Sequence, residues 1–266
     1  MILLQESYNP DMIRPADVIG VTPGLAGRAG RLQGLVAAMV LAAAGATAFA
    51  TGPLDALEPV APDALRVVLI RHGQAYSNLN PAPALPPDQL DRLTDLGREQ
   101  SRRAGEALRG RGASLVLASP AGRAHGTARE IAGVLGIEVR VEPRLRPLDL
   151  GRAPDGKELS WDQRIAEWKA GEDPVPPGGE SLDQLGKRVA GLVASLRAEG
   201  TGRTVVLVAH SEVIAAYMGL LSGTQAAARW PPRVGNGSLT IVDVPASESA
   251  RVLATNYLPP ERTPSR

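Results

Sequence analysis

From residue 66 onward, the chain alternates short apolar runs with segments of helical periodicity. The apolar runs predict strands at residues 66–71, 114–118, 137–141, 204–209 and 239–244. The segments between them predict helices at about residues 94–109, 122–135, 181–199 and 211–221. Strands that alternate with helices are typical of an α/β fold. We therefore expect a three-layer sandwich, in which a largely parallel central sheet carries helices on both faces.

The predicted helix at residues 181–199 has the clearest pattern. Its apolar residues recur on one face: Leu182, Leu185, Val189, Leu192, Val193 and Leu196. Ser181 and Gln184 have the spacing of a capping box, which predicts that the helix begins at Ser181.

Polar side chains follow three of the predicted strands. Arg71 and His72 end the first strand, Ser119 and Arg123 follow the second, and His210 ends the strand at residues 204–209. Ligands of parallel sheets bind beyond the carboxyl ends of the strands, so these side chains should meet at one edge. Cations and imidazoles that converge on one place indicate a site for an anion.

Composition narrows the chemistry that this site could perform. The chain has no cysteine, which excludes disulfides, thiolate zinc sites and a cysteine nucleophile. Its three histidines are His72, His125 and His210, so any histidine-based mechanism must use these. The net charge of +1 gives no reason to expect nucleic acid or an anionic membrane as a partner.

Two familiar motifs are imperfectly matched. The sequence LVAHSEV invites comparison with the nucleophile elbow of α/β-hydrolases, but Ala209 and Val213 replace its glycines and no histidine follows His210. The sequence GRAPDGK, residues 151–157, resembles a phosphate-binding loop, but Glu158 replaces the required hydroxyl residue and Pro154 removes a backbone N–H. A surface turn is the better interpretation of this second stretch.

A third comparison accounts for the whole set of motifs. They occur in the order Arg71-His72-Gly73 with Asn78, LTDLGREQ (93–100), SPAGRAHGTA (119–128), PPGGESL (176–182), VVLVAHSEVI (205–214) and GNGSLTIV (235–242). This series resembles the histidine phosphatase superfamily, in the branch that contains cofactor-dependent phosphoglycerate mutases and small broad-specificity phosphatases. The resemblance covers about residues 66–244 and implies a phosphoglycerate mutase-like fold.

The resemblance also implies a mechanism. His72 would attack phosphorus and form a phosphohistidine. Arg71, Arg123 and His210 would hold the phosphoryl group, with Asn78 and Ser211 as further substrate-binding residues. The substrate would be a small phosphorylated molecule, and neither a metal nor a cofactor would be required. His125 matches no position that the family requires, so we expect it on a helix surface.

One position departs from the family pattern. Relatives carry a glutamate as proton donor in L-x-E-x-x-x-G, whereas this chain has LRPLDLG at residues 145–151, with Pro147 at the glutamate position. Proline cannot donate a proton. Glu212 could replace the acid, as in the His-Ala-Glu of some inositol-phosphate phosphatases. Asp149 is the second candidate, and a site without an acid is the third.

These observations predict a phosphomonoesterase rather than a mutase. The alternative is a catalytically weak relative that binds phosphorylated ligands, and Pro147 is its main support. The segment at residues 151–177 corresponds to the variable cap over the family's pocket. Trp161 and Trp168 within it, seven residues apart, could line that pocket or pack a helix.

The N-terminal part has a different composition. Residues 1–50 read as a leader in which Arg28 and Arg31 precede an apolar run, residues 35–50, that ends in Ala-Phe-Ala. This pattern predicts a signal peptide and a secreted or extracytoplasmic protein. Because the 34 residues before the apolar run are long for the basic leader of a signal peptide, we hypothesise that translation starts later, at Val21. A membrane anchor, or an alanine-rich helix of a cytoplasmic protein, is the alternative. A proline-rich lead-in (51–65), the phosphatase domain (66–258) and a tail (259–266) would follow.

Overall fold

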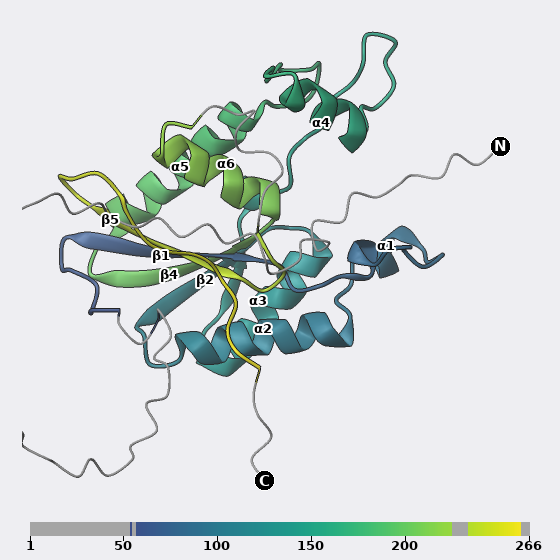
Figure 1. The fold of residues 1–266 in the computed structure, drawn as a ribbon. Coiled ribbons are helices and arrows are strands. Elements are labelled where there is room, and N and C mark those ends of the chain that lie inside the picture. Colours follow the sequence, from purple (N-terminus) through teal and green to yellow (C-terminus); the bar gives the residue numbers. More distant parts are fainter. Residues whose placement is uncertain (1–53, 55–56, 225–233, 262–266) are drawn as a thin grey trace, which may run out of the picture.

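The computed structural model describes residue 54, residues 57–224 and residues 234–261, and these residues are built around one six-stranded sheet (Figure 1). The strands lie in the order β3-β2-β4-β1-β5-β6. Their bounds are β1 Ala64–Arg71, β2 Ala113–Ala118, β3 Val139–Val141, β4 Arg203–Ala209, β5 Leu239–Pro245 and β6 Arg251–Tyr257.

The sheet is parallel through β3, β2, β4 and β1, while β5 pairs antiparallel with β1 and β6 pairs antiparallel with β5. The five predicted strands are confirmed, although the third is shorter than predicted. The sixth strand, β6, was not predicted. It lies at an edge of the sheet and has no buried residue, like the other edge strand, β3. Its sequence RVLATNY lacks the apolar alternation of IEVRV at residues 137–141, which predicted β3.

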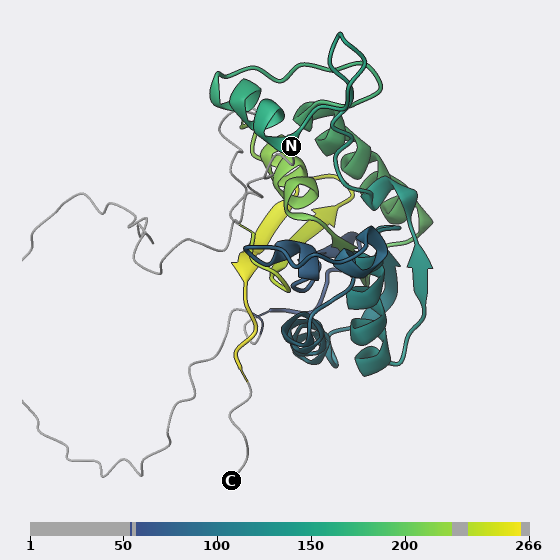
Figure 2. The ribbon, with the colours of Figure 1, turned by 90° about the vertical axis from the view of Figure 1, so that its right-hand side faces the viewer.

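Helices cover both faces of the sheet, which confirms the three-layer sandwich. Helices α2 (Asp95–Leu108) and α3 (Gly122–Leu135) lie below the sheet in Figure 1, and α5 (Leu182–Glu199) and α6 (Ser211–Leu221) lie above it. Figure 2 shows the same layers after a quarter turn. The short elements are helices α1 (Pro87–Leu90) and α4 (Trp161–Lys169) and the 3-10 turns η1 (Tyr76–Asn78) and η2 (Pro143–Leu145).

Strand β1 shows why the sheet needs two helical layers. Leu65, Val67 and Leu69 belong to the apolar cluster that contains the buried face of α5, whereas Val68 and Ile70 belong to the cluster that contains α2 and α3 residues. Side chains alternate between the faces of a strand, and every residue of β1 is buried. Both faces of this strand therefore contribute to the core.

The predicted start of α5 is also confirmed. The Ser181 side chain accepts a hydrogen bond from the Gln184 N–H at 3.1 Å, and the Gln184 side chain accepts one from the Ser181 N–H. This capping box satisfies backbone N–H groups that the first turn of a helix leaves without partners.

The predicted leader, residues 1–50, lies outside the described residues, as do most of residues 51–56 and residues 262–266 of the tail. Among the helices that the structure describes, none is long and apolar enough to cross a membrane. Export and cleavage therefore stay predictions from the sequence.

Candidate active site

The ends of two neighbouring strands carry the two histidines of the site. His72 follows β1 and His210 follows β4, and these strands are parallel and adjacent. The His72 N–H donates to the Ala209 carbonyl at 3.0 Å, which ties the two strand ends together. The imidazole rings meet edge to face, with their centroids 5.3 Å apart. The sheet thus brings together the residues that the strand-end pattern predicted.

His72 is held in one tautomer. Its Nδ1 lies 2.8 Å from the Gly73 carbonyl oxygen, and because a carbonyl can only accept, Nδ1 carries the proton. Nε2 therefore carries a lone pair. Burial lowers the pKa of His72 well below its usual value, and the charges of Arg123 and Arg71 and the neighbouring His210 lower it further. This lowered pKa favours the neutral imidazole at physiological pH.

Arg123, in the first turn of α3, connects both histidines. Its Nε donates to Nε2 of His72 at 3.1 Å, and its Nη2 donates to Nδ1 of His210 at 3.3 Å. Its Nη1 contacts Oδ1 of Asp91 at 2.5 Å. A planar guanidinium suits this arrangement, because its donors point in fixed and different directions.

His210 is also neutral and nearly fully buried. Burial lowers its pKa well below the usual value, and Arg123 and Arg71 lower it further. Because Nδ1 accepts from Arg123, the proton lies on Nε2, which contacts the Ser119 hydroxyl at 2.8 Å. Donation from Nδ1 to a phosphoryl oxygen needs the other tautomer, in which the Ser119 hydroxyl donates to Nε2.

Several side chains hold the backbone around His72. The Gly73 N–H donates to the Thr127 hydroxyl at 2.9 Å, the Gln74 N–H donates to the Gln100 amide oxygen at 2.8 Å, and the Asn236 amide donates to the His72 carbonyl at 3.0 Å. Thr127, Gln100 and Asn236 were not predicted as site residues, although each lies in one of the motifs that carry the family resemblance. That location was the only available signal for them.

Two glycines allow helix α2 to approach this loop. A Cβ built on Gly73 would lie 2.2 Å from the Gly97 carbonyl oxygen, and one built on Gly97 would lie 2.0 Å from the Gln74 carbonyl oxygen. No side chain fits in either place. The backbone of residues 73–74 therefore rests directly on the backbone of α2.

Arg71 and Asn78 complete the predicted phosphate-binding set. Nη1 of Arg71 donates to the Val234 carbonyl at 2.7 Å, and its charge acts on both histidines. The side-chain oxygen of Asn78 accepts from the Ala75 N–H at 2.9 Å and from the Asn236 amide at 3.4 Å. Because these bonds occupy the oxygen, the NH₂ group of Asn78 is the donor that it can offer to a ligand.

Glu212 and Ser211 lie in the first turn of α6, directly after His210. Glu212 is buried, and its carboxylate accepts a hydrogen bond from the Ser211 hydroxyl at 3.2 Å. Within the described part of the chain, neither residue is hydrogen-bonded to His72, Arg123 or the imidazole of His210. Of Ser211 and Glu212, only Glu212 has a side chain that could donate a proton as a general acid.

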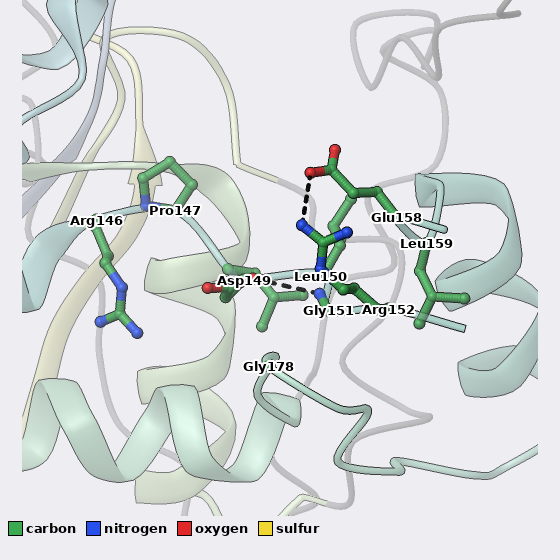
Figure 3. A pocket seen from close by; sticks show the side chains of 10 residues that line it. Arg146, Pro147, Asp149, Leu150, Gly151, Arg152, Glu158, Leu159 and Gly178 are labelled. Atoms are coloured by element: carbon green, nitrogen blue, oxygen red, sulfur yellow. Dashed lines mark hydrogen bonds and ion pairs between the residues drawn. The ribbon is translucent and has the colours of Figure 1, made fainter. Parts of the chain in front are cut away.

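Pro147 and Asp149 line a hollow of about 540 Å³ in the loop before α4. Figure 3 shows both residues beside it, with the Arg152–Glu158 ion pair on its other side. The Asp149 carboxylate accepts a hydrogen bond from the Gly151 N–H at 3.3 Å, so it supports the turn of its own loop.

Arg188 of α5 fastens this loop to the core. It pairs with Glu180 at 2.5 Å and donates to the carbonyl oxygens of Arg144, Arg146 and Pro147. Its charge also contributes to the low pKa of His210. Arg188 therefore holds the backbone at Pro147 and acts on His210 only through its charge.

Trp161 and Trp168 pack α4 rather than line this hollow. Trp168 is fully buried, and Trp161 packs on the same apolar cluster, with the two ring centroids 6.3 Å apart.

The loop at residues 151–157 forms a turn, since the Ala153 N–H donates to the Lys157 carbonyl at 2.8 Å. His125 is half-buried on α3 and belongs to none of the contacts described above. Within the ranges that the structure describes, no three His, Asp or Glu side chains cluster in a way that could hold a metal ion.

Comparison with known proteins agrees with this geometry. Residues 67–256 match the family model of the histidine phosphatase superfamily, branch 1. The chain is 31% identical over 186 residues to a probable phosphoglycerate mutase GpmB of Photorhabdus laumondii, covering 67% of this chain and 85% of the relative.

Similar solved structures include phosphatases with the same fold. A mycobacterial glucosyl-3-phosphoglycerate phosphatase, in complex with VO3, is 33% identical with a TM-score of 0.57, covering 72% of this chain and 98% of that one. The phosphoserine phosphatase of Entamoeba histolytica, at 22% identity and a TM-score of 0.59 (71% of this chain, 95% of that one), shares the fold.

The fold and the site define an α/β protein that presents a neutral histidine and a guanidinium at the carboxyl ends of parallel strands. The family match covers well over half of the sequence, and its bounds lie inside the predicted domain, residues 66–258. The chain belongs to the histidine phosphatase superfamily.

Proposed function

We propose that this protein is a phosphomonoesterase that transfers phosphate through a phosphohistidine at His72, without a metal ion. The observation that carries the proposal is the state of His72. Its Nδ1 proton is engaged with the Gly73 carbonyl and its pKa is lowered well below the usual value, so Nε2 keeps a lone pair for attack.

In the first step, the Nε2 lone pair forms a bond to phosphorus while the bond from phosphorus to the ester oxygen breaks. The leaving oxygen takes a proton from a carboxylic acid of the protein, which becomes a carboxylate. In the second step, water attacks the phosphohistidine, the N–P bond breaks, and the water's proton returns to the same carboxylate. Arg71, Arg123 and the Asn78 NH₂ group would bind the phosphoryl oxygens, where fixed donors contribute most to catalysis.

Between the candidate acids, the contacts favour Glu212. Asp149 accepts a hydrogen bond from its own loop, which gives its carboxylate a structural role. Glu212 is buried, directly follows the His210-Ser211 pair in the sequence, and among the described residues its carboxylate accepts one side-chain hydrogen bond, from the Ser211 hydroxyl. We therefore propose Glu212 as the proton donor in place of the glutamate that Pro147 removes.

The test is phosphate release by the full chain, wild type beside His72→Ala, from one aryl and one alkyl phosphate. We expect wild type to hydrolyse both esters and His72→Ala to hydrolyse neither. Quenching with a denaturant at alkaline pH during turnover should trap a phosphoenzyme in wild type alone, and later treatment with acid should release its phosphate. Equal phosphate release by the two proteins would contradict the phosphohistidine mechanism.

A second candidate function rests on Pro147. If the acid is truly missing, the protein binds phosphorylated ligands and turns them over weakly. An aryl ester has a good leaving group and needs little acid help, so hydrolysis of the aryl ester alone would indicate this case. Binding of inorganic phosphate without hydrolysis of either ester would establish a binding protein.

A further inference from the structure

Asp91 has no part in the mechanism above, yet it holds the arginine at the centre of the site. Its Oδ1 contacts Nη1 of Arg123 at 2.5 Å, and its Oδ2 accepts a hydrogen bond from the Gly122 N–H at 2.5 Å. The Asp91 and Arg123 side chains are 30% and 24% exposed. Partial burial makes this pair stronger than a surface ion pair, because less water screens it.

The start of helix α3 explains why the carboxylate comes from elsewhere in the sequence. The N-cap residue is Ala121, whose side chain has no acceptor for the first N–H groups. Asp91 supplies the acceptor from 31 residues earlier in the chain. Its negative charge is also favourable at a helix N-terminus.

Gly122 makes this approach possible. A Cβ on Gly122 would lie 2.9 Å from Oδ2 and 3.1 Å from the carbonyl oxygen of Asp91. A side chain at this position would push Asp91 away from the helix and from Arg123. The position of the Asp91 carboxylate, and through it that of the Arg123 guanidinium, therefore depends on the glycine at position 122.

The contacts of Arg123 differ in strength. The bonds to His72 and His210 are 3.1 and 3.3 Å long and have neutral acceptors, whereas the bond to Asp91 is 2.5 Å long and joins opposite charges. Attack on phosphorus uses the lone pair of His72 Nε2, so Arg123 must release that atom. The two weaker bonds can pass to phosphoryl oxygens while the bond to Asp91 stays in place.

We propose that Asp91 is a positioning residue, which anchors Nη1 of Arg123 so that Nε and Nη2 can move from the histidines to a bound phosphoryl dianion. The proposal rests on the proposed phosphate site, and it adds a residue that acts through Arg123 without touching the substrate. Without the anchor, the guanidinium would be free to leave the position from which it meets the phosphate.

The test is Asp91→Asn in the full-length protein, with two readouts. The first is kcat/KM for an aryl phosphate, which we expect to fall by about 10- to 100-fold, since a displacement of about 1 Å can cost a hundredfold in rate. The second is the Kd for inorganic phosphate measured by calorimetry, which we expect to rise at least about tenfold. Gly122→Ala should change both quantities in the same direction, although it leaves every charge in place.

Two control variants separate positioning from a general loss of structure. Asp95→Asn removes a carboxylate that is 96% exposed in the first turn of α2, and it should leave both readouts within about twofold of wild type. Ser181→Ala removes the N-cap of α5 and should lower the Tm about as much as Asp91→Asn does, without a comparable change in kcat/KM or Kd.

The outcomes distinguish this proposal from the proposed function. If kcat/KM and the phosphate Kd of Asp91→Asn stay within about twofold of wild type, the positioning role is wrong. It is also wrong if Ser181→Ala, with the same Tm as Asp91→Asn, changes kcat/KM and Kd by the same factors. If wild type hydrolyses no ester but Asp91→Asn still weakens phosphate binding about tenfold, the positioning role stands and the enzyme proposal falls. If wild type neither hydrolyses esters nor binds phosphate, both proposals fall.

Discussion

At the scale of single residues, the protonation state of His72 governs the proposed chemistry. Its neutral form is the nucleophile, and burial together with Arg123 holds its pKa well below 6.5. We expect the acid limb of the pH profile of kcat/KM to lie well below pH 6.5, because kcat/KM reports the ionisation of the free enzyme.

This expectation can be measured with an aryl phosphate, after correction for the second ionisation of the substrate, whose pKa is about 6. A corrected acid limb at pH 6.5 or above would contradict the proposed state of His72. His125→Gln is a suitable control, because it removes a histidine outside the site and should leave the profile unchanged.

The acid is the second question at this scale. Glu212→Gln keeps the shape of the side chain but removes its proton donor. We expect alkyl phosphate hydrolysis to fall by about 10²–10⁴-fold, the usual contribution of a general acid, while aryl phosphate hydrolysis changes little. The measurement is kcat/KM for matched alkyl and aryl esters.

Asp149→Asn is the matched comparison for Glu212→Gln. If Asp149→Asn produces the selective loss with the alkyl ester, the acid is Asp149 and our assignment is wrong. If neither variant loses alkyl activity that wild type has, the proton comes from another donor.

At the scale of elements, the contact between helix α2 and residues 73–74 leaves no room for a side chain. Gly97→Ala would place a Cβ 2.0 Å from the Gln74 carbonyl oxygen, so the loop or the helix must move. We expect a loss of about 1–3 kcal/mol in the free energy of unfolding, typical of overpacking, together with reduced phosphatase activity. Urea unfolding and kcat/KM measure the two effects.

Gly133→Ala on α3 is the matched control. A Cβ there has no neighbour within 4 Å, and glycine inside a helix costs about 0.5–1 kcal/mol relative to alanine. This variant should therefore be slightly more stable than wild type, with unchanged activity. Equal effects of the two substitutions would show that the tight approach at Gly97 has no special importance.

Elements also show how far the sequence alone could lead. Apolar patterns were sufficient for four strands with buried residues (β1, β2, β4 and β5) and for the four long helices, because each has a buried face. The alternation IEVRV at residues 137–141 also predicted β3, although β3 has no buried residue. The sequence RVLATNY of β6 has no such alternation and no buried residue, and β6 was not predicted. The sequence also placed His72, Arg123 and His210 together, since all three follow parallel strands.

Asp91 could not be found in this way. Its contact with Arg123 depends on how the segment around α1 folds back, and the approach depends on the missing side chain of Gly122. Neither fact has a periodic signal. The same holds for Asn236, whose contact with the His72 carbonyl joins residues 164 positions apart.

At the scale of the whole molecule, two buried neutral histidines make stability depend on pH. The folded protein keeps the pKa values of His72 and His210 well below 6.5, whereas the unfolded chain protonates them near 6.5. Below pH 6.5 the unfolded state therefore binds more protons, so the free energy of unfolding falls as the pH falls. The slope is about 1.4 kcal/mol per pH unit for each histidine, until the folded-state pKa is reached.

Urea unfolding at a series of pH values below 6.5 measures this slope. The double variant His72→Asn, His210→Asn should show a shallower dependence on pH than wild type, whatever its absolute stability. His125→Asn should keep the wild-type slope. Parallel curves for wild type and the double variant would mean that other groups cause the acid sensitivity.

The hollow beside Pro147 and Asp149 has a consequence for how this protein could change over generations. Its charged side chains pair with one another, with their own loop and with Glu180. None of the described contacts joins them to His72. The position of His72 instead depends on the backbone of α2 and of β4. Substitutions around the hollow should therefore leave the position of His72 unchanged. Under the proposed function, this loop is therefore a place where the sequence could diverge between relatives while hydrolysis at His72 is retained.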